Sequence, residues 1–148
     1  MGEWMARPLR EEDLPAVAEL ETLCFAEPWS ARALSMLLEP ENLGVVVMEE
    51  GKAIAYGGMT TILDEGSVAN VATHPDYRGR GLGGMIVNAL LDAARERGLT
   101  SVFLEVRVSN APARHLYEKV GFSVIGTRKG FYRHPVEDGL AMAWRKTP

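Results

Sequence analysis

The sequence predicts an α/β (α+β) protein with a mixed, mostly antiparallel central sheet and helices on both faces. Residues 43–73 contain three strand-like runs joined by short turns with glycine, which is typical of an antiparallel meander. Residues 82–94 repeat apolar side chains at helical spacing, and residues 101–108 alternate apolar with polar side chains. A strand, a helix and a second strand in this order predict a parallel pair of strands that the helix connects.

The 148 residues are enough for a real core, and we expect a single domain over residues 1–148. The composition, with 47% hydrophobic and 24% charged residues, is that of a soluble globular protein. The N-terminus lacks the basic and apolar regions of a signal peptide, and no apolar run approaches the roughly 20 residues of a membrane span. The net charge of −4 argues against general nucleic-acid binding, and the single Cys24 fits a reducing compartment. We therefore expect a cytoplasmic protein that binds neither nucleic acid directly nor membranes.

The first 40 residues are predicted to hold a short edge strand and two helices. Residues 7–10 suit an edge strand because proline is tolerated there. Residues 11–13 are acidic and open a helix that has Pro15 in its first turn. Residues 27–30 break this helix, and Ser30 is placed to cap the next one. The apolar faces that we expect inside are Leu14, Val17, Ala18 and Leu20, then Ala33, Leu34, Leu37 and Leu38.

Residues 43–48, 53–62 and 67–73 are the predicted meander strands, and Pro75 ends the last of them. The long central helix begins near Leu82 and ends at Gly98, a typical C-terminal cap. Its expected buried face consists of Leu82, Met85, Ile86, Ala89, Leu90, Ala93 and Ala94.

After the strand at residues 101–108, Asn110 is placed to cap a further helix that has Pro112 near its start. Gly121 ends that helix, whose predicted inner face consists of Ala113, Leu116, Tyr117 and Val120. Two last strands are expected at residues 122–128 and 140–145, with residues 131–138 as a loop between them.

The stretch from His74 to Gly84, before the central helix, has the features of a phosphate-binding loop. Glycine lets the backbone approach an anion closely, and the first amides of a helix have no partners within it. The helix dipole and two arginines add positive charge. The residues predicted to hold a pyrophosphate are Arg78, Gly79, Arg80, Gly81, Leu82, Gly83 and Gly84.

Two ligand patterns compete for this loop. Gly79-x-Gly81-x-x-Gly84 matches the dinucleotide fingerprint, and Glu105 lies at about the right distance to bind a ribose. That fingerprint directly follows a strand and opens a large parallel sheet, whereas here Pro75 and a polar loop intervene. The second pattern, Arg78-x-x-Gly81-x-Gly83, resembles the coenzyme A signature of the GNAT acetyltransferase superfamily. A glycine-rich loop without any ligand is the third interpretation.

Acetyl transfer needs a bound coenzyme, a neutral amine, a donor for the developing oxyanion and a proton for the departing thiolate. Glu105 is the candidate base, or else a solvated carboxylate that pairs with Arg107. Tyr117 is the candidate acid, or else a core aromatic residue on the inner helix face. A phenol with a pKa of about 10 can protonate a thiolate with a pKa of about 8.5 only with some reluctance, so geometry decides.

Other residues are weaker candidates. Backbone amides of Val71, Ala72 or Thr73 could polarise the acetyl carbonyl if the strand leaves its ladder there, as at a bulge. Trp29 and Tyr132 either line an acceptor pocket or anchor the core and a loop. We find no nucleophile elbow and no metal-ligand spacing, and we interpret all three histidines as surface or loop residues: His74, His115 and His134.

The longer motifs resemble the RimI group of the GNAT superfamily, which acetylates the N-terminal alanine of a small-subunit ribosomal protein. The resemblance covers nearly the whole chain, from Arg7 to Trp144. The motifs that carry it are residues 25–30, 104–113, 116–122, 130–132 and 137–142. Residues 133–136, where the acceptor peptide should lie, depart from the family pattern, as do Thr73 and Gly79.

The resemblance implies the GNAT fold and acetyl-CoA as cosubstrate, without a metal. It implies that Glu105 accepts a proton, directly or through water, and that Tyr117 donates one. It also implies that the pyrophosphate is held by residues 79–84, and that the other coenzyme contacts come from Val71, Ala72, Thr73 and Asn110.

The pKa of the acceptor amine also bears on which acceptor the protein uses. The α-amine of a peptide has a pKa near 8 and a lysine near 10.4, so far more of the α-amine is neutral at pH 7. One carboxylate acting through water suffices for the α-amine, which favours an N-terminal acceptor without excluding lysine. The alternatives are an acetyltransferase for lysine or a small-molecule amine, a coenzyme-A-binding module without catalysis, and a protein that binds a nicotinamide dinucleotide.

Overall fold

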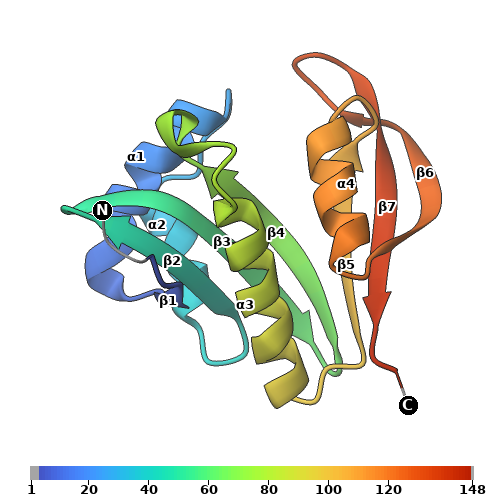
Figure 1. Ribbon diagram of the computed structural model, residues 1–148, viewed down its shortest axis with the longest axis horizontal. Coiled ribbons are helices and arrows are strands. Elements are labelled where there is room, and N and C mark those ends of the chain that lie inside the picture. Colours follow the sequence, from blue (N-terminus) through green and yellow to red (C-terminus); the bar gives the residue numbers. More distant parts are fainter. Residues whose placement is uncertain (1–3, 148) are drawn as a thin grey trace.

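One seven-stranded sheet runs through the computed structural model, which describes residues 4–147 (Figure 1). Its strand order is β1-β2-β3-β4-β5-β7-β6, and β4–β5 is the parallel pair among otherwise antiparallel neighbours. The strands are β1 (Arg7–Pro8), β2 (Leu43–Glu49), β3 (Lys52–Ile62), β4 (Glu65–Thr73), β5 (Ser101–Arg107), β6 (Ser123–Tyr132) and β7 (Glu137–Arg145). The predicted mixed, mostly antiparallel sheet is confirmed. The first three residues of the N-terminal segment compared with signal peptides lie outside the described residues.

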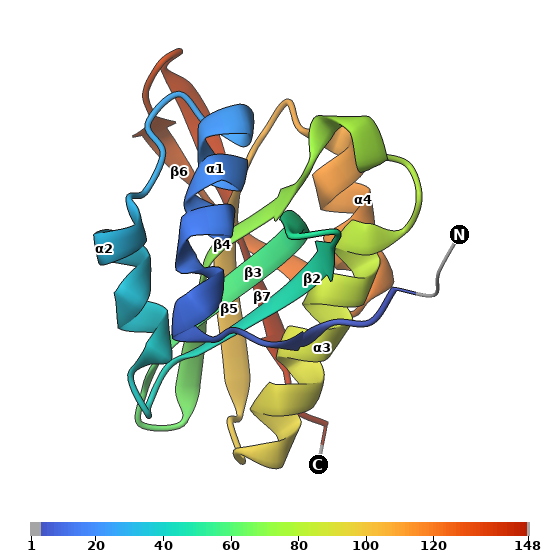
Figure 2. The same ribbon diagram turned by 90° about the vertical axis from the view of Figure 1, so that its left-hand side faces the viewer.

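Helices cover both faces of the sheet, as predicted (Figure 2). On one face, α1 (Leu14–Cys24) and α2 (Ala31–Leu34) pack on β2 and β3. On the other, α3 (Leu82–Glu96) and α4 (Ala111–Lys119) cover the core from β2 to β7. Three short 3₁₀ segments complete the chain: Glu11–Asp13, Ser35–Leu38 and Pro75–Tyr77. Within residues 4–147, no helix combines the length and the apolar character that crossing a membrane requires.

The predicted helix ends are present. The Ser30 hydroxyl accepts a hydrogen bond from the Ala33 N–H at 3.1 Å, and the Asn110 side chain accepts one from Ala113 at 3.2 Å. Gly57 brings α3 close to β3, since a Cβ there would lie 2.5 Å from Cγ2 of Ile86. This contact fixes the central helix against the middle of the sheet.

The parallel strands β4 and β5 are paired only at their first residues. Their register runs from Glu65 opposite Ser101 to Ser67 opposite Phe103, and beyond that point the strands diverge (Figure 1). We call the diverging part, residues 68–73 of β4 and 104–107 of β5, the fork. A register shift against β3 at Gly58 and Met59 places a bulge in β4 at the start of the fork.

The backbone of β4 presents N–H groups to the fork. The N–H of His74 donates to the carbonyl of Ile54 in β3, at 2.8 Å. Because successive residues of a strand direct their backbone groups to alternate sides, Ala72 also faces β3, where it lies opposite Tyr56. Val71 and Thr73 therefore direct their backbone groups toward the open side. The condition set by the sequence analysis, that the strand leaves its ladder near Val71, is met by the diverging strands, with a bulge beside them.

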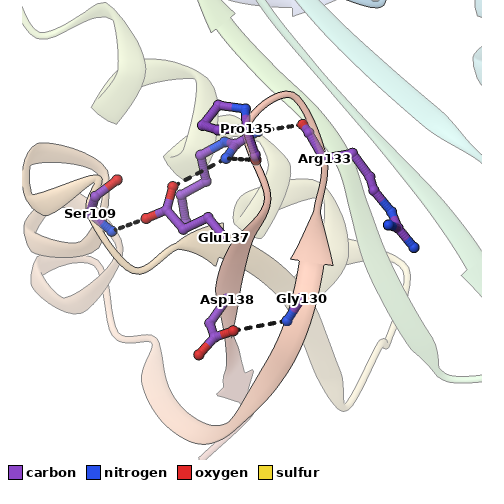
Figure 3. A network of polar contacts seen from close by, with 7 residues as sticks. Ser109, Gly130, Arg133, Pro135, Glu137 and Asp138 are labelled. Carbon is purple, nitrogen blue, oxygen red and sulfur yellow. Dashed lines mark hydrogen bonds and ion pairs between the residues drawn. The ribbon is translucent and has the colours of Figure 1, made fainter.

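The C-terminal hairpin corrects one prediction. Residues 131–138 are not a loop, because β6 extends to Tyr132, which pairs with Glu137 at the start of β7. Gly130, at φ +62°, sits in an irregularity of β6, and the Asp138 carboxylate accepts a hydrogen bond from its N–H at 2.8 Å (Figure 3). Only residues 133–136 connect the strands, and β7 lies between β5 and β6.

Asp13, at the entry to α1, should make stability depend on pH. Its buried carboxylate accepts two hydrogen bonds from the Arg7 guanidinium, at 2.7 and 2.8 Å. The hydrogen bonds from Arg7, above all, lower the pKa of Asp13. A carboxyl group with a lowered pKa stabilises the fold above its unfolded pKa of about 3.9, and this contribution is lost as the pH falls through the folded pKa.

We therefore expect Asp13→Asn to lower the free energy of unfolding by about 1–2 kcal/mol at pH 7. The difference from wild type should shrink as the pH falls from about 4 toward the lowered folded pKa, because Asp13 becomes protonated first in the unfolded chain and then in the folded protein. Urea unfolding at pH 7 and pH 3 measures both values. An equal difference at the two pH values would contradict the role of the charge.

Candidate active site

The glycine-rich loop ends in the N-terminus of α3, as predicted. Gly81 is the N-cap residue with φ +83°, and Gly79 has φ +79°. Both lie in the left-handed region that glycine adopts without strain. The first hydrogen bond of the helix joins the Met85 N–H to the Gly81 carbonyl, at 3.1 Å. The N–H groups of residues 82–84 precede it and have no acceptor inside the helix.

The two arginines of the loop point to its flanks. The Arg78 Nε donates to the Thr73 carbonyl at 3.2 Å, and its guanidinium lies 3.7 Å from the Cys24 sulfur. The Arg80 guanidinium lies 5.4 Å from the centre of the Tyr77 ring. The positive potential at the loop itself therefore comes first from backbone amides and the helix dipole.

Glu105 projects from β5 in the fork, with its side chain 28% exposed. Its Oε2 accepts a hydrogen bond from Arg128 in β6, at 3.0 Å. The alternative in which Glu105 pairs with Arg107 is wrong, because Arg107 pairs with Glu137 instead, at 3.1 Å. The Arg128 guanidinium is 56% exposed, so this ion pair contributes little to stability and can be exchanged for another partner.

Tyr117 lies on the face of α4 that covers the sheet. Its ring meets Phe122 edge to face, with the ring centres 5.8 Å apart, so the ring packs on the core as one interpretation predicts. Burial raises the pKa of Tyr117 to about 12. The hydroxyl is therefore protonated at neutral pH and can serve there only as a donor or a neutral acceptor.

Tyr132 is the last residue of β6. The centre of its ring lies 4.6 Å from the guanidinium of Arg107, which follows Glu105 by two residues on the same face of β5. Burial first, and then the charge of Glu105, raise the pKa of Tyr132 to about 12. The structure thus places Glu105 and Tyr132 beside the same face of β5, whereas the Tyr117 ring packs from α4 on the core.

Trp29 lies on the other side of the fork, in the loop between α1 and α2. It packs on the core beneath α1, and its N–H donates to Glu21 at 2.9 Å. The loop that carries Trp29 meets the connection after Tyr132, because His134 Nε2 lies 3.4 Å from a Glu27 carboxylate oxygen.

Asn110 follows β5 at the start of α4. Its side-chain oxygen is engaged by the cap of α4, so its amide NH₂ is the group that can donate to a ligand.

Glu21 is a buried residue that the sequence analysis missed. Its fully buried carboxylate accepts hydrogen bonds from the Tyr56 hydroxyl, from Asn70 Nδ2 at 2.7 Å and from the Trp29 N–H. It links α1 to the loop of Trp29 and to the residue before Val71. Its spacing of four residues from Val17 places it on the inner face of α1, and that spacing was the signal available in the sequence.

The histidines do not form a metal centre. His74 accepts a hydrogen bond from the Asp76 N–H at 3.1 Å, and His115 is exposed on α4. Over residues 4–147, no three His, Cys, Asp or Glu side chains are grouped closely enough to hold a metal ion.

Comparison with known proteins gives a consistent result. Residues 14–122 match the profile of the Acetyltransferase (GNAT) family. The ribosomal protein bS18-alanine N-acetyltransferase of Escherichia coli K12 is 36% identical over 131 residues, 88% of this chain and 87% of its own. The enzyme of the same name from Salmonella typhimurium is 34% identical over 137 residues, 91% of this chain and 93% of its own.

The structural comparison agrees. The crystal structure of the ribosomal-protein-S18-alanine N-acetyltransferase from Escherichia coli superposes with a TM-score of 0.90 and 32% identity. The match covers 99% of this chain and 96% of that one. This likeness extends over the mixed sheet, which is not the large parallel sheet expected for a dinucleotide-binding protein.

Proposed function

The chain belongs to the GNAT acetyltransferase family and is an acetyl-CoA-dependent N-acetyltransferase, and we propose that it acetylates the N-terminal alanine of a small-subunit ribosomal protein. The relatives at 34–36% identity are named for that reaction on ribosomal protein bS18. The single observation that carries the proposal is the fork between β4 and β5, where the partly exposed Glu105 projects from β5 and β4 has an unpaired backbone edge. A ribosomal acceptor would place the reaction in the cytoplasm. We take residues 1–148 as one catalytic domain, because one sheet unites every strand.

The coenzyme fits the loop before α3. In our proposal the diphosphate binds residues 79–84, where the first helical N–H groups have no partner in the helix. A Cβ at Gly79 or Gly81 would meet nothing within 4 Å, so the outer side of the turn is open. Arg78 and Arg80 flank the loop, and we propose that their guanidinium groups also bind the phosphates. The remaining proposed contacts come from Val71 and Thr73, on the open side of β4, and from Asn110. Ala72, expected from the sequence as a further backbone contact, instead directs its backbone groups toward β3.

The coenzyme supplies an acetyl thioester, and this chain's residues manage the protons. Glu105, directly or through water, takes the proton from the acceptor's ammonium group, so that the neutral nitrogen can form the new C–N bond. Backbone N–H groups of Val71 or Thr73 face the fork and can stabilise negative charge on the carbonyl oxygen. Tyr117 gives its proton to the sulfur as the C–S bond breaks. The attacking nitrogen loses its second proton as the amide forms, and this proton restores the Tyr117 phenol through solvent.

The acceptor end of the fork is the proposed position of the peptide. Trp29 and Tyr132 lie in the two segments that meet there through His134 and Glu27, and we propose that they contact the acceptor. A lysine or small-molecule amine is the second candidate, since the same proton transfers would serve it. The smaller neutral fraction of lysine at pH 7 makes it the weaker acceptor.

An acetylation assay with matched peptides tests the proposal. One peptide begins with free alanine and carries an internal lysine, and its control is the same peptide with a blocked N-terminus. We expect mass spectrometry to find acetyl groups on the α-amine of the first peptide and almost none on the control. Equal lysine acetylation on both peptides would contradict the proposed acceptor. Tight coenzyme binding without turnover would favour a non-catalytic module.

A further inference from the structure

Arg107, the last residue of β5, holds both ends of the connection between β6 and β7. Its Nη2 donates to the Arg133 carbonyl at 2.9 Å, and its Nη1 donates to the Pro135 carbonyl at 3.0 Å (Figure 3). The same Nη1 meets Glu137 Oε1 at 3.1 Å. We call residues 133–136 the β6–β7 turn. One side chain thus fixes this turn at its first residue, at its third and at the strand that follows.

The contacts need the particular shape of arginine. A guanidinium is planar and presents several N–H donors in a rigid arrangement, which suits three separate acceptors better than the point charge of lysine. The Arg107 guanidinium also lies 4.6 Å from the centre of the Tyr132 ring. Its side chain is only 28% exposed, so these contacts are partly shielded from water.

Glu137 extends the contacts to the segment before α4. Its Oε2 accepts a hydrogen bond from the Ser109 N–H at 2.7 Å, next to Asn110 (Figure 3). Hydrogen bonds from Ser109, and after them the Arg107 guanidinium, hold the pKa of Glu137 below its ordinary value. The carboxylate is therefore charged at neutral pH, and the ion pair ties the β6–β7 turn to the junction between β5 and α4.

The position of the turn connects these contacts to the site. Tyr132 comes directly before it and lies against Arg107, which is two residues after Glu105 in β5. His134, within the turn, reaches Glu27 in the loop that also carries Trp29. The turn therefore spans the fork at the end where an acceptor would approach Glu105, and Arg107 is the side chain that holds it there.

We infer that Arg107 is a positioning residue for a peptide acceptor: it fixes the β6–β7 turn and Tyr132 as the wall that contacts the first residues of the peptide. This inference rests on the proposed function. Arg107 does not touch the reacting atoms. In this inference the residues of a peptide beyond the first lie along the β6–β7 turn. If Arg107 no longer held the turn, binding of a peptide would therefore weaken more than binding of a short amine.

Steady-state kinetics of Arg107→Gln and Arg107→Lys test this role. We expect Arg107→Gln to raise the KM for an alanine-initiated octapeptide about tenfold, with kcat and the Kd for acetyl-CoA within about twofold of wild type. Arg107→Lys should fall between the two, because an ammonium group can satisfy only part of the set of acceptors. The rise in KM should be smaller with alaninamide, which has no residue beyond the first.

Arg95→Gln is the matched control. Arg95 also pairs with a carboxylate, Asp92 at 3.1 Å, and lies 5.2 Å from the centre of the Trp144 ring, but it projects from the far end of α3. Its peptide KM should equal that of wild type. Thermal unfolding of each variant separates a loss of stability from a change in KM.

The outcomes are distinguishable. If the wild-type protein acetylates the octapeptide and Arg107→Gln has the same peptide KM as wild type, the inference is overturned and the proposed function remains intact. An equal rise in KM for the octapeptide and alaninamide, or a lower kcat at unchanged KM, would also overturn it. Wild-type protein that acetylates no peptide α-amine would contradict the proposed function, and the inference with it.

Discussion

Replacing Tyr117 with phenylalanine should lower kcat by about a hundredfold or more while the Kd for acetyl-CoA stays within about twofold. The change keeps the ring and its edge-to-face contact with Phe122, so the core around α4 is preserved. It removes only the hydroxyl that we propose protonates the departing sulfur. Initial rates and calorimetric titration measure the two quantities.

The raised pKa of Tyr117 sharpens this expectation. With a pKa of about 12, the hydroxyl keeps its proton throughout the neutral and mildly alkaline range. Full transfer to a free thiolate with a pKa of about 8.5 would be uphill by about 3.5 units, or roughly 5 kcal/mol. The proton must therefore move as the C–S bond breaks. Deprotonation of the Tyr117 hydroxyl should therefore not lower kcat until well above pH 10.

Tyr77→Phe is the control for a lost tyrosine hydroxyl. The Tyr77 hydroxyl donates to Glu49 at 2.6 Å. Its variant keeps the ring that lies against Arg80 and should retain kcat within about twofold, because the hydroxyl that it loses has no proposed part in the reaction. A Tyr117→Phe enzyme with wild-type kcat would show that the phenol only packs against the core.

Gly83→Val is the second change for which we expect a large effect, at least a tenfold rise in the Kd for acetyl-CoA. Gly83 is the second residue of α3, within the proposed diphosphate site. A Cβ there would lie 3.1 Å from Cδ2 of Leu116 in α4. The branched side chain would therefore occupy the space between α3 and α4 beside the free amides. Overpacking of this kind costs about 1–3 kcal/mol, so the fold should survive.

The double variant Gly83→Val with Leu116→Ala separates the two possible causes. Leu116→Ala makes room for the valine, so a loss caused by displaced helices should disappear in the double variant. If the valine side chain itself keeps the diphosphate from its site, the double variant should bind acetyl-CoA as weakly as Gly83→Val alone. Leu116→Ala alone supplies the reference. Recovery of binding in the double variant would contradict the proposed cradle.

Local patterns predicted much of the fold. The spacing of apolar residues in α3 predicted its buried side, and Ser30, Asn110, Gly98 and Gly121 mark helix ends as expected. The meander was predictable because its turns are short. The insertion of β7 between β5 and β6 was not, since that order depends on contacts between residues distant in sequence.

The sequence was enough to propose residue types for the candidate site but not to predict the connections among them. Periodicity placed Glu105 on the face of β5 opposite the apolar core, yet its partner Arg128 comes from β6 rather than from its own strand. Arg107 was predicted only as the alternative partner of Glu105, and its three acceptors around the β6–β7 turn became visible only in three dimensions. Such connections join distant segments, which spacing along one segment does not reveal.

A crystal structure with acetyl-CoA bound tests the central claim most directly. We predict that the diphosphate oxygens lie within hydrogen-bond distance of backbone N–H groups in residues 79–84. The thioester should lie in the fork, between Val71 and the Tyr117 hydroxyl. A coenzyme bound with its diphosphate away from the N-terminus of α3, or with its thioester outside the fork, would contradict the account.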